Sequence, residues 1–128
     1  LNGVWRYSNT TNGSDASPPF GQQLQNSVLV PFCLESALSG MHAKSLVVCP
    51  LFDTGVTGKN RYWSWYQTSF DVPSAWPSTN NVILNFGAVD YEATMFVNGK
   101  KAGFHRGGYF EFSIDVTPYL STNSSNEL

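Results

Sequence analysis

Charged side chains are scarce in this sequence, at 12% of 128 residues, and the formal net charge is only −2. Nucleic-acid-binding domains typically carry a basic surface, so we expect no nucleic-acid partner. Disordered chains have little to bury, whereas aromatic residues make up 15% of this chain. The composition therefore favours a folded, aromatic-rich β protein.

Long apolar runs are also missing. The longest spans residues 45–52 and is interrupted by Pro50, far short of the ~20 residues of a membrane-spanning helix. We therefore predict no membrane span. No signal peptide is visible at Leu1, which we interpret as a processed or partial chain. The length suits a single domain with its own core over residues 1–128.

Groups suited to metal binding or cofactor chemistry are few. His42 and His105 are the only histidines, and neither stands at metal-ligand spacing from cysteines or carboxylates. Gly107-Gly108 lacks the Gly-Lys-Ser/Thr ending of a phosphate-binding loop. We therefore expect no metal site and no cofactor.

The clearest strand pattern lies between Val82 and Val116. Apolar side chains recur at every second position, which predicts strands over residues 82–86, 92–97, 100–104 and 110–116. Asn98-Gly99 separates the second strand from the third, and this dipeptide favours a tight hairpin turn in which both residues have positive φ. The pattern is typical of antiparallel strands with one buried face, so we predict an all-β fold.

The first half of the chain adds three expected strands. Residues 1–7 form an opening strand, and residues 8–19 are rich in loop formers. Residues 28–32 form an edge strand or strand end, because Pro31 cannot donate a ladder hydrogen bond. The aromatic strand over residues 61–73 could stack on a sugar, but strands of this kind usually bury their rings, so we favour a core role.

Four motifs follow one another in the second half: Phe-Gly-Ala-Val-Asp-Tyr at 86–91, Val-Asn-Gly at 97–99, His-Arg-Gly-Gly-Tyr at 105–109, and Phe112. In this order they resemble the N-terminal sugar-binding domain of glycoside hydrolase family 2, which includes β-galactosidases, β-glucuronidases and β-mannosidases. Residues 1–7, 31–40 and 65–73 are similar to the family as well. The resemblance implies a jelly-roll β-sandwich of the galactose-binding-domain type.

Two features depart from the family pattern. Residues 41–60 form a longer connection than is usual, and the chain stops at Leu128 where further strands are expected. The resemblance therefore implies a domain that is incomplete at its C-terminal end.

Catalysis is not expected in this segment. The nine Asp and Glu residues show no spacing that predicts the carboxylate pair of a glycosidase. Asn126-Glu127 is similar to the dipeptide around the family's acid/base, but it stands at the start of a strand after a polar loop, and we do not assign it that role. In the family the catalytic carboxylates lie in a separate TIM barrel, which 128 residues cannot contain.

Six side chains are candidate sugar contacts: Asp90, Tyr91, His105, Arg106, Tyr109 and Glu35. Asp and Arg direct hydrogen bonds to hydroxyl groups, and a Tyr ring offers a stacking face. Structural roles are the alternative. Asp90 could cap a turn, His105 could anchor the Gly-Gly loop, and Glu35 could accept backbone N–H groups or meet an arginine.

Two weak signals point to an extracellular, secreted glycoprotein. Asn9, Asn12 and Asn123 each begin an Asn-x-Ser/Thr acceptor sequence in a polar stretch, although polar loops also produce such sequences by chance. Cys33 and Cys49 could form a disulfide that contributes about 3 kcal/mol. Two buried free thiols are the alternative.

The resemblance implies a non-catalytic domain that binds carbohydrate and supports a catalytic TIM barrel of the same or a longer chain. Two other classes of function stay open. One is a stand-alone carbohydrate-binding module. The other is a structural or adhesive glycoprotein that self-associates by strand pairing at an open sheet edge.

Overall fold

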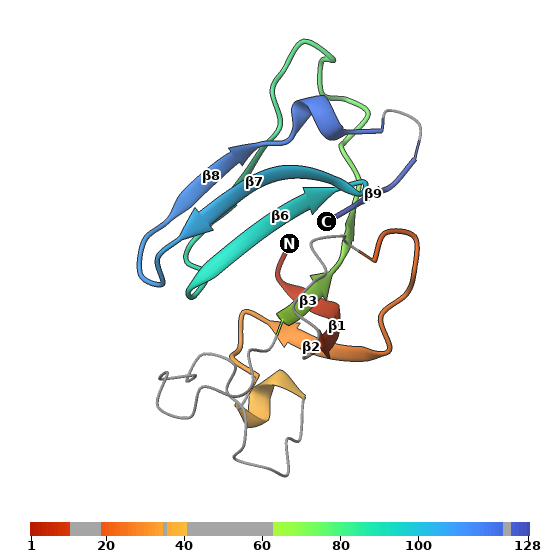
Figure 1. The fold of residues 1–128 in the computed structure, drawn as a ribbon. Helices are drawn as coiled ribbons and strands as arrows, with labels where there is room; N and C mark the ends of the chain where they lie inside the picture. The colour runs from red at the N-terminus through yellow and green to blue at the C-terminus, as the bar shows by residue number, and fades with distance from the viewer. Residues whose placement is uncertain (11–18, 35, 41–62, 122–123) are drawn as a thin grey trace. The chain divides into compact units, whose positions relative to one another are not determined.

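The computed structural model describes residues 1–10, 19–34, 36–40, 63–121 and 124–128 (Figure 1). The elements in chain order are β1 (Gly3–Thr10), β2 (Asn26–Val30), the 3-10 turn η1 (Ala37–Ser39), β3 (Trp63–Gln67), β4 (Ser69–Phe70), β5 (Ile83–Phe86), β6 (Glu92–Val97), β7 (Lys100–Arg106), β8 (Phe112–Asp115), the 3-10 turn η3 (Thr117–Tyr119) and β9 (Asn126–Glu127). Strands dominate these residues, which confirms the all-β class. No helix in the described ranges is long and apolar enough to cross a membrane.

The chain divides into two compact units, residues 1–68 and 69–128. In the first unit β1 is the middle strand of an antiparallel sheet in the order β2-β1-β3. Tyr7 on β1 is buried, and its ring meets Tyr66 of β3 edge-on at 5.2 Å between centroids. The expected opening strand is present but runs on to Thr10, because β3 pairs with residues 6–10 of β1. A partner distant in sequence thus extends a strand into residues with loop-like composition.

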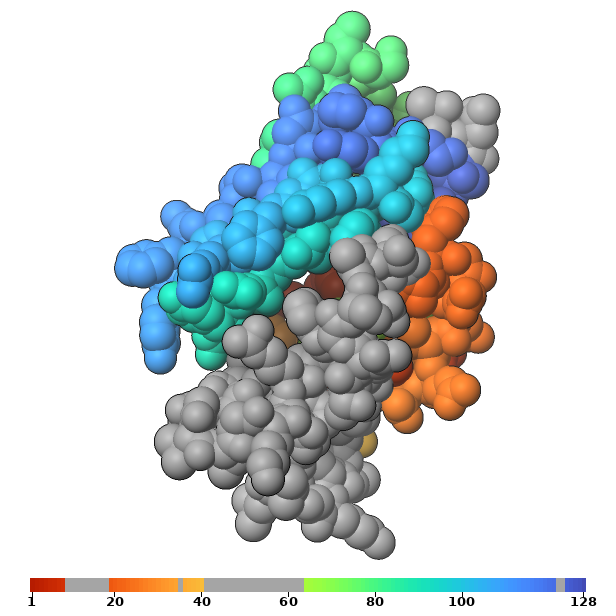
Figure 2. Space-filling view, viewed as in Figure 1, coloured from red at the N-terminus to blue at the C-terminus, as the bar shows by residue number. Residues whose placement is uncertain are grey.

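The second unit contains three antiparallel strand pairs, β4-β9, β5-β8 and β6-β7. The β6-β7 hairpin turns at Asn98 and Gly99, with φ angles of 51° and 76°, and Val97 pairs with Lys100 across the turn. The predicted hairpin is therefore confirmed. One face of the hairpin is turned toward the viewer in Figure 2, in teal to light blue.

A small apolar core holds the second unit together. Val97 and Val116 are fully buried beside Phe70, and Leu84 and Ile114 of the β5-β8 pair pack against them. Val97, Leu84 and Ile114 are apolar positions of the predicted alternation, and the full burial of Val97 stabilises the unit by ~1.5–3 kcal/mol.

The predicted start of the strand over residues 110–116 is wrong. Phe110 was expected on the apolar face of a strand over residues 110–116, but β8 begins at Phe112 and the Phe110 side chain is 73% exposed. Phe86 is the last residue of β5, and it pairs with Phe112. Phe110 therefore has no opposing strand residue to cover it.

Candidate functional site

The predicted sugar contacts Asp90, Tyr91, His105, Arg106 and Tyr109 gather at the end of the β6-β7 hairpin that lies opposite the Asn98-Gly99 turn. Asp90 and Tyr91 precede β6, and His105 and Arg106 end β7. The Gly107 N–H donates to the Tyr91 carbonyl oxygen at 2.8 Å and joins the two segments. Glu35, the sixth candidate, lies outside the described residues.

Tyr91 and Arg106 form an exposed pair at this end. The guanidinium carbon of Arg106 lies 5.4 Å from the centroid of the Tyr91 ring, and its Nε lies 3.1 Å from Oε1 of Glu92. An exposed ion pair of this kind is worth only about 0–1 kcal/mol, so its main effect is to orient the guanidinium. Tyr91 itself remains 53% exposed, which leaves part of its ring available for stacking.

His105 has contacts that position the Gly-Gly loop. Its Nε2 lies 3.0 Å from the Gly107 carbonyl oxygen, and because a carbonyl oxygen only accepts, Nε2 is the donor. The imidazole stacks on Phe112 with centroids 3.8 Å apart and planes 10° apart. These contacts favour the interpretation in which His105 anchors the loop, and a sugar contact by His105 stays a prediction.

The Phe112 ring also stacks on the ring of Phe86 in β5. Its ring lies 4.8 Å from that of Phe86 at an interplanar angle of 9°, and the two residues are register partners in the β5-β8 pair. The sequence indicated two apolar positions here but not a shared stack with His105. The signal that identifies it is the pairing of β5 with β8, which brings residues 26 positions apart side by side.

Asp90 lies against the second glycine of the loop. A Cβ atom built on Gly108 would lie 2.5 Å from Oδ1 of Asp90 and 2.8 Å from its Cγ, so a larger residue cannot take this position unless the carboxylate moves. Gly107 has a φ of +136°, a conformation that favours glycine. The peptide bond between Asp90 and Tyr91 is cis. Gly108 thus permits the close approach of the loop to Asp90, and Gly107 supplies the backbone conformation of the loop.

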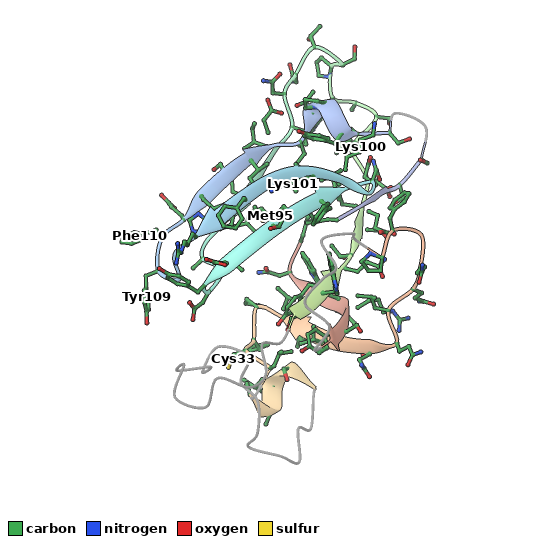
Figure 3. The ribbon with its side chains drawn as sticks, viewed as in Figure 1. Cys33, Met95, Lys100, Lys101, Tyr109 and Phe110 are labelled. Atoms are coloured by element: carbon green, nitrogen blue, oxygen red, sulfur yellow. The ribbon has the colours of Figure 1, made fainter. Side chains whose placement is uncertain are left out.

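Tyr109 and Phe110 project from the loop between β7 and β8, at the opposite end of the strands from Lys100 (Figure 3). Tyr109 is 92% exposed and Phe110 is 73% exposed. We call Tyr91, Tyr109 and Phe110 the aromatic corner. Exposed aromatic groups gathered in this way mark surfaces for a sugar or a protein partner.

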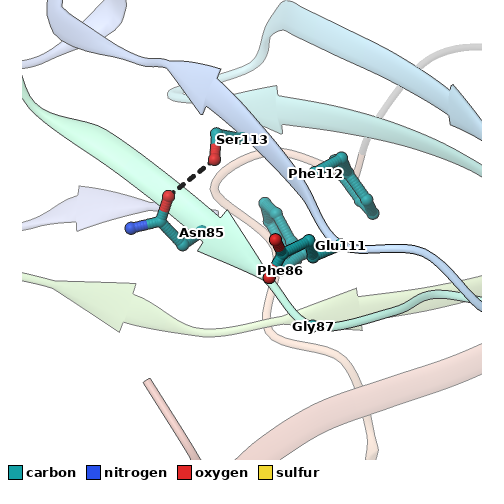
Figure 4. Close-up of a pocket in the computed structure, with 6 residues that line it drawn as sticks. All are labelled: Asn85, Phe86, Gly87, Glu111, Phe112 and Ser113. Carbon is teal, nitrogen blue, oxygen red and sulfur yellow. Dashed lines mark hydrogen bonds between the residues drawn. The ribbon is translucent and has the colours of Figure 1, made fainter.

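A shallow cavity of about 490 Å³ lies beside the β5-β8 pair (Figure 4). Its lining comprises Asn85, Phe86, Gly87, Glu111, Phe112 and Ser113. Ser113 Oγ donates to Asn85 Oδ1 at 2.7 Å, and Glu111 adds an exposed carboxylate. An amide, a hydroxyl and a carboxylate beside an aromatic ring are groups that bind sugar hydroxyls. Sequence reasoning missed this cavity, because Asn85 and Ser113 occupy the ordinary solvent face of two strands and Glu111 directly precedes β8.

Most of the remaining predicted sites lie outside the described residues. Cys33 is exposed, and Cys49 lies outside the described residues. Asn9 lies within β1, whereas Asn12 and Asn123 fall outside the described ranges. The disulfide and the three glycosylation sites therefore stay predictions. Within the described part of the chain, no group of three His, Cys, Asp or Glu residues could hold a metal ion.

An exposed aromatic corner with an arginine and a polar cavity on an antiparallel β fold offer the stacking and hydrogen-bonding groups that a carbohydrate-binding β domain uses. The particular family follows from a direct comparison. The family model described as "Glycosyl hydrolases family 2, sugar binding domain" matches residues 1–128, and the chain belongs to this family. The resemblance inferred from the motifs is therefore confirmed.

Similar proteins are much longer than this chain. A β-galactosidase of Thermoanaerobacter pseudethanolicus is 34% identical over 68 residues, which cover 53% of this chain and 9% of that protein. A β-glucuronidase of Paenibacillus borealis is 36% identical over 53 residues, which cover 41% and 9%. The structure of Bifidobacterium dentium β-glucuronidase complexed with coumarin-3-O-glucuronide matches with a TM-score of 0.62 and 28% identity, over 99% of this chain and 18% of that one.

Proposed function

We propose that the whole protein hydrolyses β-linked glycosides, and that residues 1–128 supply a non-catalytic domain that shapes one wall of the substrate cleft. Membership of the family supports this proposal, as do relatives named β-galactosidase and β-glucuronidase. The two catalytic carboxylates belong to a TIM barrel outside this segment. For the domain itself we propose the finer architecture of a galactose-binding-like jelly roll.

The aromatic corner is the observation that carries the proposal. Tyr109 and Phe110 expose most of their surface, and burial of each ring against another domain would stabilise the contact by ~1.5–3 kcal/mol. Tyr91 and Arg106 lie at the same end of the hairpin and supply a stacking face and hydrogen-bond donors. We infer that Tyr109 and Phe110 contact the barrel, while Tyr91 and Arg106 face the sugar.

Hydrolysis by the natively isolated protein tests the proposal. We expect release of the chromophore from at least one of the aryl β-glucuronide, β-galactoside and β-mannoside substrates. Tyr109→Ala should lower kcat/KM, whereas Trp76→Ala, at another exposed aromatic residue, should leave kcat/KM unchanged. Inactivity on all three substrates, by a protein that is folded and intact, would overturn the proposal.

Sugar binding by this domain alone is a second candidate function, and the polar cavity favours it. Asn85, Glu111 and Ser113 place an amide, a carboxylate and a hydroxyl on one opening. NMR titration with galactose and with glucuronate should shift the resonances of these residues. Glu111→Gln should weaken the response. Shifts confined to the aromatic corner would exclude the cavity as the sugar site.

We also propose that the protein is extracellular and glycosylated. Three acceptor sequences, at Asn9, Asn12 and Asn123, support this proposal. A Cys33–Cys49 disulfide would suit the same compartment. The intact mass before and after deglycosylation, with and without a thiol label, tests both. An unchanged mass together with two labelled thiols would refute the extracellular assignment.

A further inference from the structure

The turn residue Asn98 forms side-chain and backbone hydrogen bonds with β9. Its Nδ2 donates to the Tyr119 carbonyl oxygen and to Asn126 Oδ1, both at 2.8 Å. Its Oδ1 accepts from the Glu127 N–H at 3.0 Å, and its own N–H donates to the Glu127 carbonyl oxygen at 2.9 Å. Asn126 is only 1% exposed. We call Asn98, Tyr119, Asn126 and Glu127 the Asn98 cluster.

Asn98 is followed by glycine, and this dipeptide is prone to a spontaneous covalent reaction. The backbone nitrogen of Gly99 loses its proton and attacks Cγ of Asn98, because glycine has no side chain to hinder the approach. A bond between this nitrogen and Cγ forms, the Cγ–Nδ2 bond breaks, and ammonia leaves. Water then opens the resulting succinimide and gives aspartate or isoaspartate. The reaction consumes one water and needs no oxidant or reductant.

The native contacts oppose this reaction. For Cγ to turn toward the Gly99 nitrogen, the side chain must release Tyr119, Asn126 and Glu127 together. These contacts are partly buried, and polar groups that lose their partners there carry a free-energy cost. Reaction is therefore limited to molecules in which β9 has separated locally from the turn, a sub-global opening that needs no unfolding of the whole unit.

We propose that Asn98 is a deamidation site controlled by β9: docking of β9 suppresses the reaction, and completion of the reaction prevents β9 from docking again. Aspartate replaces the Nδ2 donor by a carboxylate oxygen. That oxygen would face the Tyr119 carbonyl and Asn126 Oδ1, two acceptors that now lie 2.8 Å from Nδ2. Isoaspartate also inserts a backbone carbon into a two-residue turn.

The rate of deamidation in the folded and the denatured protein tests the first half of the proposal. The isolated protein is incubated in ¹⁸O-labelled water at mildly alkaline pH, with and without denaturant, and the peptide that contains Asn98-Gly99 is quantified. We expect at least ~10-fold slower conversion in the folded protein, which corresponds to an opening free energy of about 1.4 kcal/mol. Equal rates would overturn the proposal.

A variant identifies β9 as the controlling element. Asn126→Ala removes one acceptor of the Asn98 amide and leaves the bonds to Tyr119 and Glu127, so conversion at Asn98 in the folded variant should be faster than in the unmutated folded protein. Asn2-Gly3 lies in the first unit and serves as the internal reference, because its conversion should not respond to this change. Unaltered conversion at Asn98 in a folded variant would refute control by β9.

Hydrogen exchange of the unmutated protein tests the second half and does not depend on the variant folding. The Glu127 N–H donates to Asn98 Oδ1, so its protection should fall in proportion to the converted fraction. The Tyr7 amide in the central strand of the other unit is the matched reference. Full protection of Glu127 in fully converted protein would show that β9 docks without the Asn98 amide.

Discussion

Replacement of the buried Asn126 by alanine should strongly destabilise the second unit. Asn126 Oδ1 accepts from Asn98 Nδ2 at 2.8 Å and from the Ser121 N–H at 2.7 Å. Its Nδ2 donates to the Ser121 carbonyl oxygen at 3.4 Å. The side chain thus joins the β6-β7 turn, the segment after η3, and β9 in one network.

The magnitude follows from these contacts. Two well-formed hydrogen bonds are worth about 0.5–1.5 kcal/mol each, and a partner left buried without a hydrogen bond adds a desolvation cost of about 1–3 kcal/mol. Asn98 keeps its bond to Tyr119, so the Ser121 N–H is the main donor left without a partner. These contributions add up to about 2–6 kcal/mol. Because the Ser121 N–H is only partly buried, we expect a loss of about 2–4 kcal/mol in the free energy of unfolding.

Urea denaturation measures the loss directly. With a slope of ~2 kcal/mol per molar urea, the midpoint should fall by roughly 1–2 M. Asn81→Ala is the matched control, because Asn81 is exposed and makes one long hydrogen bond of 3.3 Å to Asp115; its effect should stay within about 0.5 kcal/mol. An Asn126 variant as stable as the Asn81 control would refute the network as a source of stability.

Three further predictions concern the loop, the aromatic corner and acid stability. Gly108→Ala should lower the free energy of unfolding by about 1–3 kcal/mol, measured by thermal or urea unfolding, because the new Cβ meets Asp90. Gly87→Ala is the control and should be nearly neutral, since nothing lies within 4 Å of its Cβ. Equal effects of the two substitutions would contradict the close approach of Gly108 to Asp90. Phe110→Ala should change unfolding by less than about 0.5 kcal/mol yet lower kcat/KM of the whole protein, and a loss of stability instead would assign Phe110 to the core. Hydrogen bonds from the Thr117 side chain, and to a lesser extent from its backbone, lower the pKa of Asp115 below 3.8. The stabilising contribution of Asp115 is therefore present above pH 3.8 and is lost as the pH falls through the lowered pKa. NMR titration should show that Thr117→Ala raises the pKa of Asp115, and an unchanged pKa would refute the assignment.

Local sequence chemistry was sufficient for several parts of this protein. Asn98 and Gly99 adopt the positive φ angles that the dipeptide predicts, because the preference for such a turn resides in the two residues themselves. The alternation around Leu84 and Ile114 identified core positions correctly, since strand periodicity depends only on neighbours along the chain. The ordered motifs identified the family, and the family model confirms it over residues 1–128.

Pairing between distant segments decided the rest. The sequence by itself indicated Phe110 as a core residue and Asn126 as the polar start of a strand, but Phe110 is exposed and Asn126 is buried. Phe110 lies beyond the end of the β5-β8 pair, and Asn126 meets a turn 28 positions away. Whether an individual side chain is covered depends on which distant strand lies beside it, and only the tertiary structure determines that partner.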